Sequence, residues 1–452
     1  MASIRPFRGL RYDVARAGDP ARLMSPPYDV VDAAQRAELA ARSPNNSIHY
    51  VLPEGEGPAK YQRGAAELRG QIERAMVRDG APAIYVYHQR YTVEGHARTR
   101  RGFIALIELT RFGEGPVLAH ERTLAGPKQD RLELMRATMA HLELVFGLFA
   151  DPQREWEAKV ASALHDPVLH ADFDHIEHTL YRVDDPQVVA ALQQHLADKK
   201  IYIADGHHRY ETMCTFRDEL AERGHPSARW GMIYLANLDD PELTVLPTHR
   251  LVHSLPKVEL EDVLTTVAPW FEVSREPLPK SGLALRERLQ RAGAERAAFG
   301  LAVPGTGELC VLTLRAGFDP NAAGLGALPP ALQRLDVALL HELVIERALG
   351  IGKPAQEAKT NLRYYKSTDE ALAVAKNGDG EVRMGDGPAP AANAERSDIQ
   401  LVCFMNATPV ADVRAVCDSG QVMPQKSTFF HPKIPNGLVI HDLRAADEDP
   451  SG

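Results

Sequence analysis

Residues 205–209 read Asp-Gly-His-His-Arg, and no other short stretch of the sequence brings together as many side chains that could bind a ligand or transfer a proton. A β-rich run at residues 201–204 precedes them, and an amphipathic pattern follows at residues 210–223. Together these predict a strand, a tight turn and a helix. The first turn of a helix exposes backbone N–H groups and carries a partial positive charge. The junction therefore predicts a site for phosphate oxygens.

Each residue of this motif has a predicted role. Gly206 lets the backbone turn tightly and approach a ligand. Arg209 is predicted to hold a phosphate through two hydrogen bonds, and His207 and His208 to donate hydrogen bonds or transfer a proton near neutral pH. Asp205 is predicted to cap the helix, orient a histidine or hold Mg²⁺. A purely structural Asp-Gly turn is the alternative, but two histidines between Asp and Arg favour a functional site.

A second cluster of charged residues lies at residues 120–131. Glu121 is a candidate general base toward a substrate hydroxyl, because a hydroxyl that accepts a transferred group must lose its proton. Lys128 and Arg131 are candidates for neutralising phosphate charge. A solvated charged loop would show the same residue types, and this alternative stays open.

Two further loops are candidates for substrate contact. Ser-Pro-Pro-Tyr-Asp-Val at residues 25–30 offers Tyr28 and Asp29 from a rigid segment. The polar, aromatic and basic stretch at residues 423–433 offers Lys426 and Ser427. Loops positioned by a scaffold often carry binding residues, although each of these also fits a scaffold role.

The elements that must position these residues are short strands and helices in alternation. They predict an α+β fold, with mixed sheets and flanking helices. We expect an α/β domain at residues 1–240 that contains the motif, a second α+β domain at 241–443 and a polar tail at 444–452. The most linker-like stretch is 376–398. Predicted helices include residues 59–79, 129–148, 186–197, 210–223, 329–349 and 409–419.

The composition excludes several classes of protein. The chain has 452 residues, of which 44% are hydrophobic and 25% charged, so extensive disorder is excluded. No apolar run is long enough to span a bilayer, and we expect no membrane association. The net charge of -9 disfavours nucleic acid as a partner. Four scattered cysteines without a Cys-x-x-Cys pair are typical of a cytoplasmic protein.

Five segments in order along the chain resemble the domain-of-unknown-function 1015 (DUF1015) family. The resemblance covers nearly the whole chain, but it implies no function, because the family is itself uncharacterised. The segments are Ile-Arg-Pro-Phe-Arg-Gly-Leu at 4–10, Ser-Pro-Pro-Tyr-Asp-Val-Val at 25–31, the motif at 204–209, Leu-Asp-Val at 335–337 leading to His-Glu-Leu at 341–343, and Met-Pro-x-Lys-Ser-Thr at 423–428.

The motif at residues 205–209 is also similar to the phosphate-binding turn of the ParB/sulfiredoxin-like superfamily, in particular of its free-serine kinases. This resemblance implies a ParB/sulfiredoxin-like nucleotide-binding core with an additional α/β domain. It also implies that residues 205–209 hold the phosphates of ATP or ADP. The base of those kinases is a glutamate that has no securely matching position here, and Glu121 is assigned from local chemistry alone.

The sequence thus favours a nucleotide-dependent phosphotransferase acting on a small amino acid or hydroxy acid. Free L-serine is the favoured acceptor, with ATP or ADP as donor and Mg²⁺ as cofactor. One alternative is a ParB-like nucleotide-binding switch, which would need a basic DNA-facing surface. Another is a metal-dependent hydrolase with Asp205, His207 and His208 as ligands. The acceptor, the donor and a homodimeric state stay open.

Overall fold

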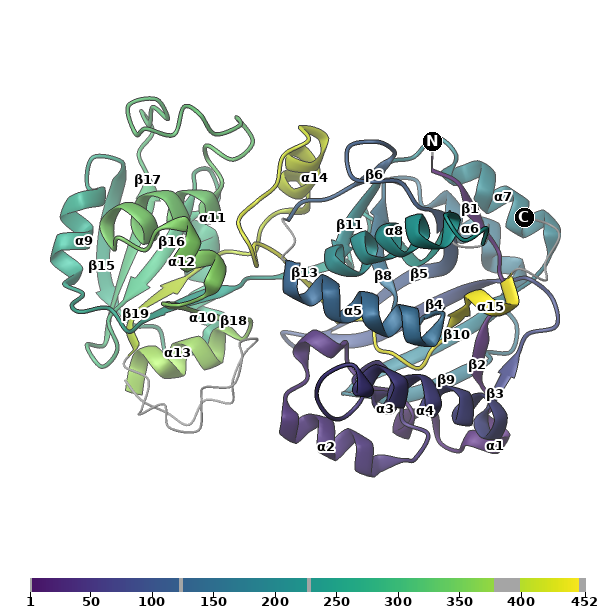
Figure 1. Ribbon diagram of the computed structural model, residues 1–452. Coiled ribbons are helices and arrows are strands. Elements are labelled where there is room, and N and C mark those ends of the chain that lie inside the picture. The colour runs from purple at the N-terminus through teal and green to yellow at the C-terminus, as the bar shows by residue number, and fades with distance from the viewer. Residues whose placement is uncertain (1, 122–124, 226–228, 378–398, 447–452) are drawn as a thin grey trace. The chain divides into compact units, whose positions relative to one another are not determined.

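The computed structural model describes residues 2–121, 125–225, 229–377 and 399–446, and the chain divides into two compact units (Figure 1). Unit 1 comprises residues 1–119, 123–244 and 432–452, and unit 2 comprises residues 120–122 and 245–431. The division after residue 244 lies close to the expected one at 240. The end of the chain differs from the expectation, because residues 432–446 belong to unit 1. Most of the expected linker and tail, residues 378–398 and 447–452, lies outside the described residues.

Unit 1 is built on a mixed sheet that its described residues form from nine strands. Strands β12 and β8 run parallel, as do β11 and β6, whereas β11 and β8 run antiparallel. β1 (Ile4–Arg5) pairs with β5 beside this path. The strand order is β6 (Val117–Leu118), β11 (Ile201–Asp205), β8 (Val145–Phe149), β12 (Trp230–Asn237), β5 (His96–Glu108), β4 (Ile84–Val93), β10 (Ile176–Val183) and β9 (Leu169–Phe173).

Helices cover this sheet, and α8 (His207–Ala221) lies beside α5 (Ala125–Thr138) (Figure 1). Two short pairs of strands complete unit 1: β2 (Leu10–Tyr12) with β3 (Met76–Arg78), and β7 (Ala140–His141) with β21 (His441–Asp442). The β7–β21 pairing holds the end of the chain in unit 1. The remaining helices are α1 (Val14–Ala17), η1 (Pro20–Arg22), η2 (Tyr28–Val30), α2 (Ala33–Arg42), α3 (Ile48–Val51), α4 (Ala59–Ala75), α6 (Glu155–Val160), η3 (Ala161–Ala163), α7 (Pro186–Leu196) and α15 (Leu443–Ala446).

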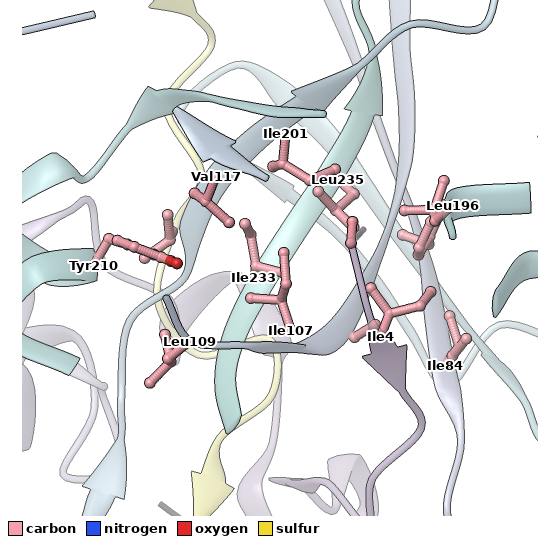
Figure 2. Close-up of a cluster of buried hydrophobic side chains, with 14 of the residues drawn as sticks. Ile4, Ile84, Ile107, Leu109, Val117, Leu196, Ile201, Tyr210, Ile233 and Leu235 are labelled. Carbon is pink, nitrogen blue, oxygen red and sulfur yellow. The ribbon is translucent and has the colours of Figure 1, made fainter. Parts of the chain in front are cut away.

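The core of unit 1 is a layer of branched apolar side chains between the sheet and its helices. Figure 2 shows Ile107 from β5, Ile201 from β11 and Ile233 from β12, with Leu196 from α7 and Tyr210 from α8 packed around them. All five are at most 1% exposed. This layer fixes the position of β11 and α8, and therefore of the turn between them.

Unit 2 contains an antiparallel sheet, for which its described residues supply six strands. The strand order is β15 (Phe271–Pro277), β17 (Glu308–Leu314), β16 (Ala298–Ala302), β19 (Ile399–Phe404), β14 (His249–His253) and β18 (Leu362–Tyr365). A short strand β13 (Thr244–Leu246) pairs with β20 (Phe429–His431). The helices are α9 (Leu260–Val267), α10 (Gly282–Ala292), α11 (Asp336–Leu339), the π-helix η5 (Leu340–Ala348), α12 (Lys353–Ala358), α13 (Thr368–Asn377) and α14 (Val410–Asp418).

The predicted fold class, mixed sheets with flanking helices, is confirmed. Three predicted helices are shorter than expected. The helix expected at 59–79 gives way to β3 at Met76, and the helix expected at 329–349 begins only at Asp336. The helix expected at 129–148 ends at Thr138, because Met139 adopts a positive φ of 51° and the run Val145–Phe149 is a fully buried strand. None of the described helices has the length and apolar character of a membrane-spanning segment.

Candidate functional site

The turn between β11 and α8 has the geometry that the sequence predicts. Asp205 ends β11, and Gly206 adopts a left-handed conformation with φ 84° and ψ 31° at the N-cap of α8. Gly206 has no side chain with which to cap the helix. No N-cap side chain therefore accepts hydrogen bonds from the first turn of α8, and a helix start of this kind can bind phosphate oxygens.

Asp205 faces a cation at each of its carboxylate oxygens. The ammonium group of Lys433 contacts Oδ1, and Nη2 of Arg209 lies 2.5 Å from Oδ2. Burial raises the pKa of Asp205, but Lys433, Arg209 and His207 outweigh it and hold the pKa well below its usual range. Asp205 is therefore an ionised carboxylate that organises the positive charges around the turn.

Arg209 is buried beside the turn and bonded to neighbouring residues of unit 1. Its side chain is only 5% exposed, and its guanidinium donates to Asp205 and to the carbonyl oxygen of Leu144. Burial lowers the pKa of Arg209, but Asp205, Glu143 and Asp29 raise it more, so the group stays charged. The predicted direct contact of Arg209 with phosphate stays a prediction, because two nitrogens of the guanidinium already donate to Leu144 and Asp205. Arg209 positions Asp205 and adds charge behind the turn.

The two histidines differ in exposure. His207 is buried near the ring of Phe112, whereas His208 is half-buried and lies in the first turn of α8. The carbonyl oxygen of His208 accepts a hydrogen bond from Oγ1 of Thr212 at 2.7 Å, which fixes the backbone of this turn. Of the two imidazoles, that of His208 is the better placed to meet a ligand.

Lys433 is the site residue that the sequence alone did not reveal. The amide of Gln89 donates to the carbonyl oxygen of Lys433 at 3.0 Å, and Nη2 of Arg100 donates to that of Pro432 at 2.6 Å. Arg100 is buried, with its guanidinium 4.5 Å from the ring centre of Phe146. The segment that carries Lys433 is thus anchored on strands β4 and β5. The only sequence signal was the basic character of the loop.

Arg131 is buried in unit 1 and contacts two acidic side chains and an aromatic ring. Its side chain is 3% exposed, and it lies 2.5 Å from Asp130 and 3.2 Å from Glu143. Its guanidinium is 4.0 Å from the ring centre of Tyr28. Burial raises the pKa of Asp130, but Arg131 and Lys60 bring it down to about 2. These contacts make Arg131 a residue that joins α5 to the loop carrying Tyr28.

The remaining predicted residues of unit 1 are Lys128, Tyr28 and Asp29, of which only Asp29 is exposed. Lys128 forms an ion pair with Glu211 of α8 at 3.2 Å. Asp29 is exposed, and it is one of the carboxylates that raise the pKa of Arg209. The backbone N–H of Tyr28 lies 3.4 Å from Glu143. Unit 1 thus brings Tyr28 and Asp29 into the electrostatic surroundings of the β11–α8 turn.

Glu121, Lys426 and Ser427 belong to unit 2. One oxygen of Glu121 accepts the backbone N–H of Ser427 at 3.0 Å. Lys426 adopts a left-handed conformation with φ 57°, and its carbonyl oxygen accepts from Nη2 of the buried Arg250 at 3.1 Å. A non-glycine residue in this conformation persists only where its surroundings hold it. The predicted site residues therefore form two groups, one in each unit.

Metal chemistry does not fit Asp205. No group of three or more His, Cys, Asp or Glu side chains suited to a metal ion occurs in the described part of the chain. Both oxygens of Asp205 already face cations, which repel a divalent ion. The predicted Mg²⁺ ligand role of Asp205 and the metal-dependent hydrolase with His207 and His208 as further ligands therefore have no support in this geometry.

The geometry of this turn can be set beside comparisons with known proteins. The sequence model of the family described as "Protein of unknown function (DUF1015)" matches residues 4–338. The chain belongs to the DUF1015 family. A comparison of this DUF1015 chain with curated proteins gives no match.

Several solved structures are similar to this DUF1015 protein. A conserved hypothetical protein from Pyrococcus furiosus has a TM-score of 0.33 and 14% identity, covering 73% of this chain and 94% of its own. A free serine kinase in complex with AMP has a TM-score of 0.32 and 14% identity, covering 72% and 88%. SbnI from Staphylococcus aureus, with a C-terminal truncation, has a TM-score of 0.32 and 9% identity, covering 74% and 88%. Scores this low assign no function.

Proposed function

We propose that this DUF1015 protein is a nucleotide-dependent phosphotransferase for a small hydroxylated metabolite. Free L-serine is the favoured acceptor, which would give O-phosphoserine. The observation that carries the proposal is the β11–α8 turn, where the left-handed Gly206 starts a helix with no capping side chain beside ionised Asp205 and its two cations. The likeness of residues 205–209 to the motif of free-serine kinases supports the same reading.

The phosphates of ADP or ATP, with their bound Mg²⁺, would lie against the first turn of α8. Lys433, Arg209 and Asp205 form an ion-paired group at that turn, whose own net charge is one positive charge. This charge adds to the partial positive charge of the helix N-terminus. His208 would donate a hydrogen bond to a phosphate oxygen. Phosphoryl transfer requires mainly such positioning and charge stabilisation.

The acceptor hydroxyl would attack the terminal phosphorus of the nucleotide. A new O–P bond forms, the bond to the leaving nucleotide oxygen breaks, and the hydroxyl proton passes to a carboxylate. Glu121 is our candidate for that base. Tyr28 and Asp29 would contact the acceptor, and the exposed carboxylate of Asp29 suits the ammonium group of an amino acid.

The decisive experiment is a search for phosphorylated product by mass spectrometry. The full-length protein is incubated with Mg²⁺, ADP or ATP and a pool of amino acids and hydroxy acids, and each acceptor is examined for the mass of one added phosphoryl group. We expect a phosphorylated product, with serine the strongest. Nucleotide binding without any phosphorylated acceptor would overturn the proposal and favour a nucleotide-gated switch.

Variants then test the roles of individual residues. Glu121→Gln should lower kcat by about 10²-fold or more, which is the usual contribution of a general base. Asp29→Asn should raise the KM of the acceptor, and His208→Ala that of the nucleotide. Glu38→Gln is the matched control, because Glu38 is an exposed carboxylate that pairs with Arg42 on α2. If Glu121→Gln behaves as the control does while Asp29→Asn abolishes turnover, the base is Asp29.

A further inference from the structure

Unit 1 contains a cavity of about 380 Å³ that shares no residue with the β11–α8 turn. Its wall comes from β1 and the loop after it, from β3, from β5, from α7 and from β21. Cavities of this size are typical of sites for small molecules. The loop of its wall that contains Phe7 and Arg8 is part of the first segment that resembles the DUF1015 family. No step of the proposed phosphotransfer uses it.

The charged side chains on this wall are three arginines and two aspartates. Nη2 of Arg78 lies 2.7 Å from Asp442, and Nε of Arg8 donates to the carbonyl oxygen of Asp79 at 3.1 Å. Each of these bonds uses one nitrogen of a guanidinium that has three. The third arginine is Arg5 and the second aspartate is Asp184, so the wall carries one net positive charge.

A buried imidazole adds a polar group to the same wall. His441 is 2% exposed, and its Nε2 has no hydrogen-bond partner among the described residues. Its Nδ1 lies 3.2 Å from Nδ1 of His141, so one ring donates to the other. Burial lowers the pKa of His441, and His141, Arg5 and Arg78 lower it further, so the ring is neutral. If His141 is the donor, Nε2 of His441 carries the proton and can donate in turn.

We propose that this cavity is a second ligand site, which binds an oxyanion group, phosphate or carboxylate, on a small apolar body. Arg8 and Arg78 would contact the oxyanion, because their planar N–H groups match its geometry. His441 would donate from Nε2, in the tautomer that an anion selects. Phe7, Leu106 and Val189 line the cavity as well and suit the apolar body.

Three probes of similar size test this proposal: phenyl phosphate, benzoate and benzyl alcohol. Binding to the full-length protein is titrated by ligand-observed NMR at constant ionic strength. We expect saturable binding of at least one of the two acids and none of the uncharged alcohol. The acid that binds more tightly identifies the source of the oxyanion. Binding of benzyl alcohol equal to that of the acids would overturn the proposal, as would saturable binding of none of the three.

Two variants locate the binding. Arg8→Met and His441→Phe should each weaken binding of the preferred acid about tenfold, since each removes one charged or polar contact. Arg42→Met is the matched control, because Arg42 is exposed and pairs with Glu38. Melting temperatures show whether each variant is folded, and Arg8→Met alone decides if His441→Phe is not. Wild-type affinity in the variants, or displacement of the acid by ADP, would overturn the assignment to this cavity.

Discussion

Asp205 shows how much of a site is decided by a single residue and its neighbours. The spacing of Asp205 and Arg209, four residues across a helix start, suits an ion pair, and the structure contains it. The ion pair with Lys433 could not be predicted, because 228 residues separate the two in sequence. Residue types therefore predicted an anion site and one of its ion pairs, while the other partners of each charge depended on the tertiary fold.

Replacing Lys433 with methionine should destabilise the protein at neutral pH. The carboxylate of Asp205 would lose one of its two cations while its side chain stays only 19% exposed. We expect a loss of about 1–3 kcal/mol in the free energy of unfolding, and a higher KM for the nucleotide. Urea unfolding at pH 7 measures the first, and nucleotide titration the second.

The difference in the free energy of unfolding between wild type and Lys433→Met should shrink at acidic pH. The pKa of Asp205 is lower in the folded than in the unfolded state, so its stabilisation is present above the unfolded value of about 3.9 and is lost as the pH falls toward the folded value. A gap between wild type and Lys433→Met that stays constant from pH 7 to pH 3 would show that the ion pair is not its origin.

At the scale of elements, the local pattern predicted the turn better than the rest of the fold. A β-branched run followed by Asp-Gly and an amphipathic stretch identified β11 and α8 to within three residues at either end. The stretch expected as a helix at 129–148 was wrong beyond Thr138, because burial of β8 between β11 and β12 overrides local helix propensity. Short strands that depend on partners far along the chain, such as β21, leave no such local pattern.

The element that we expect to be most sensitive is the turn itself. A Cβ at Gly206 would lie 2.9 Å from Nε of Arg209, and the φ of 84° already disfavours a side chain. Gly206→Ala should therefore cost about 1–3 kcal/mol for the backbone, and more for the displaced guanidinium. Gly224→Ala is the matched control, because its φ is 78° and no atom lies within 4 Å of the added Cβ. Thermal unfolding measures both.

Equal destabilisation by the two substitutions would contradict a close packing of Arg209 on the turn. If the contact matters as proposed, Gly206→Ala also weakens nucleotide binding, whereas Gly224→Ala leaves it unchanged. The comparison separates the conformational cost, which both variants share, from the loss of the positioned guanidinium.

At the scale of the whole molecule, the sequence indicated two units but not how the chain is shared between them. Composition placed the division near residue 240, and the structure divides after residue 244. That residues 432–446 return to unit 1 follows from pairing such as that of His441 with His141. Such pairing depends on three-dimensional neighbours that one sequence does not reveal. The same return carries Lys433 to Asp205, so the site could be found only in part from the sequence.

The histidines buried throughout both units should make the whole protein sensitive to acid. Burial is the largest cause that lowers their pKa, so they stay neutral in the folded state, whereas the unfolded chain takes up protons below pH ~6.5. The stability that these neutral histidines contribute is thus present above that pH, and it is lost as the pH falls toward their pKa values in the folded state. The pKa is about 4 for His88, His141 and His178, and about 3 for His249 and His341.

Each such histidine contributes about 3 kcal/mol to this loss, and several together exceed the stability of a typical domain. We expect acid unfolding with a midpoint between about pH 4 and 6, measured by urea titrations from pH 7.5 downward. His178→Gln should lower the proton uptake on unfolding by close to one, because His178 is buried between Tyr87 and the carbonyl of Phe173. A free energy of unfolding that stays constant between pH 7.5 and 5 would mean that these imidazoles are protonated within the fold, and would contradict the prediction.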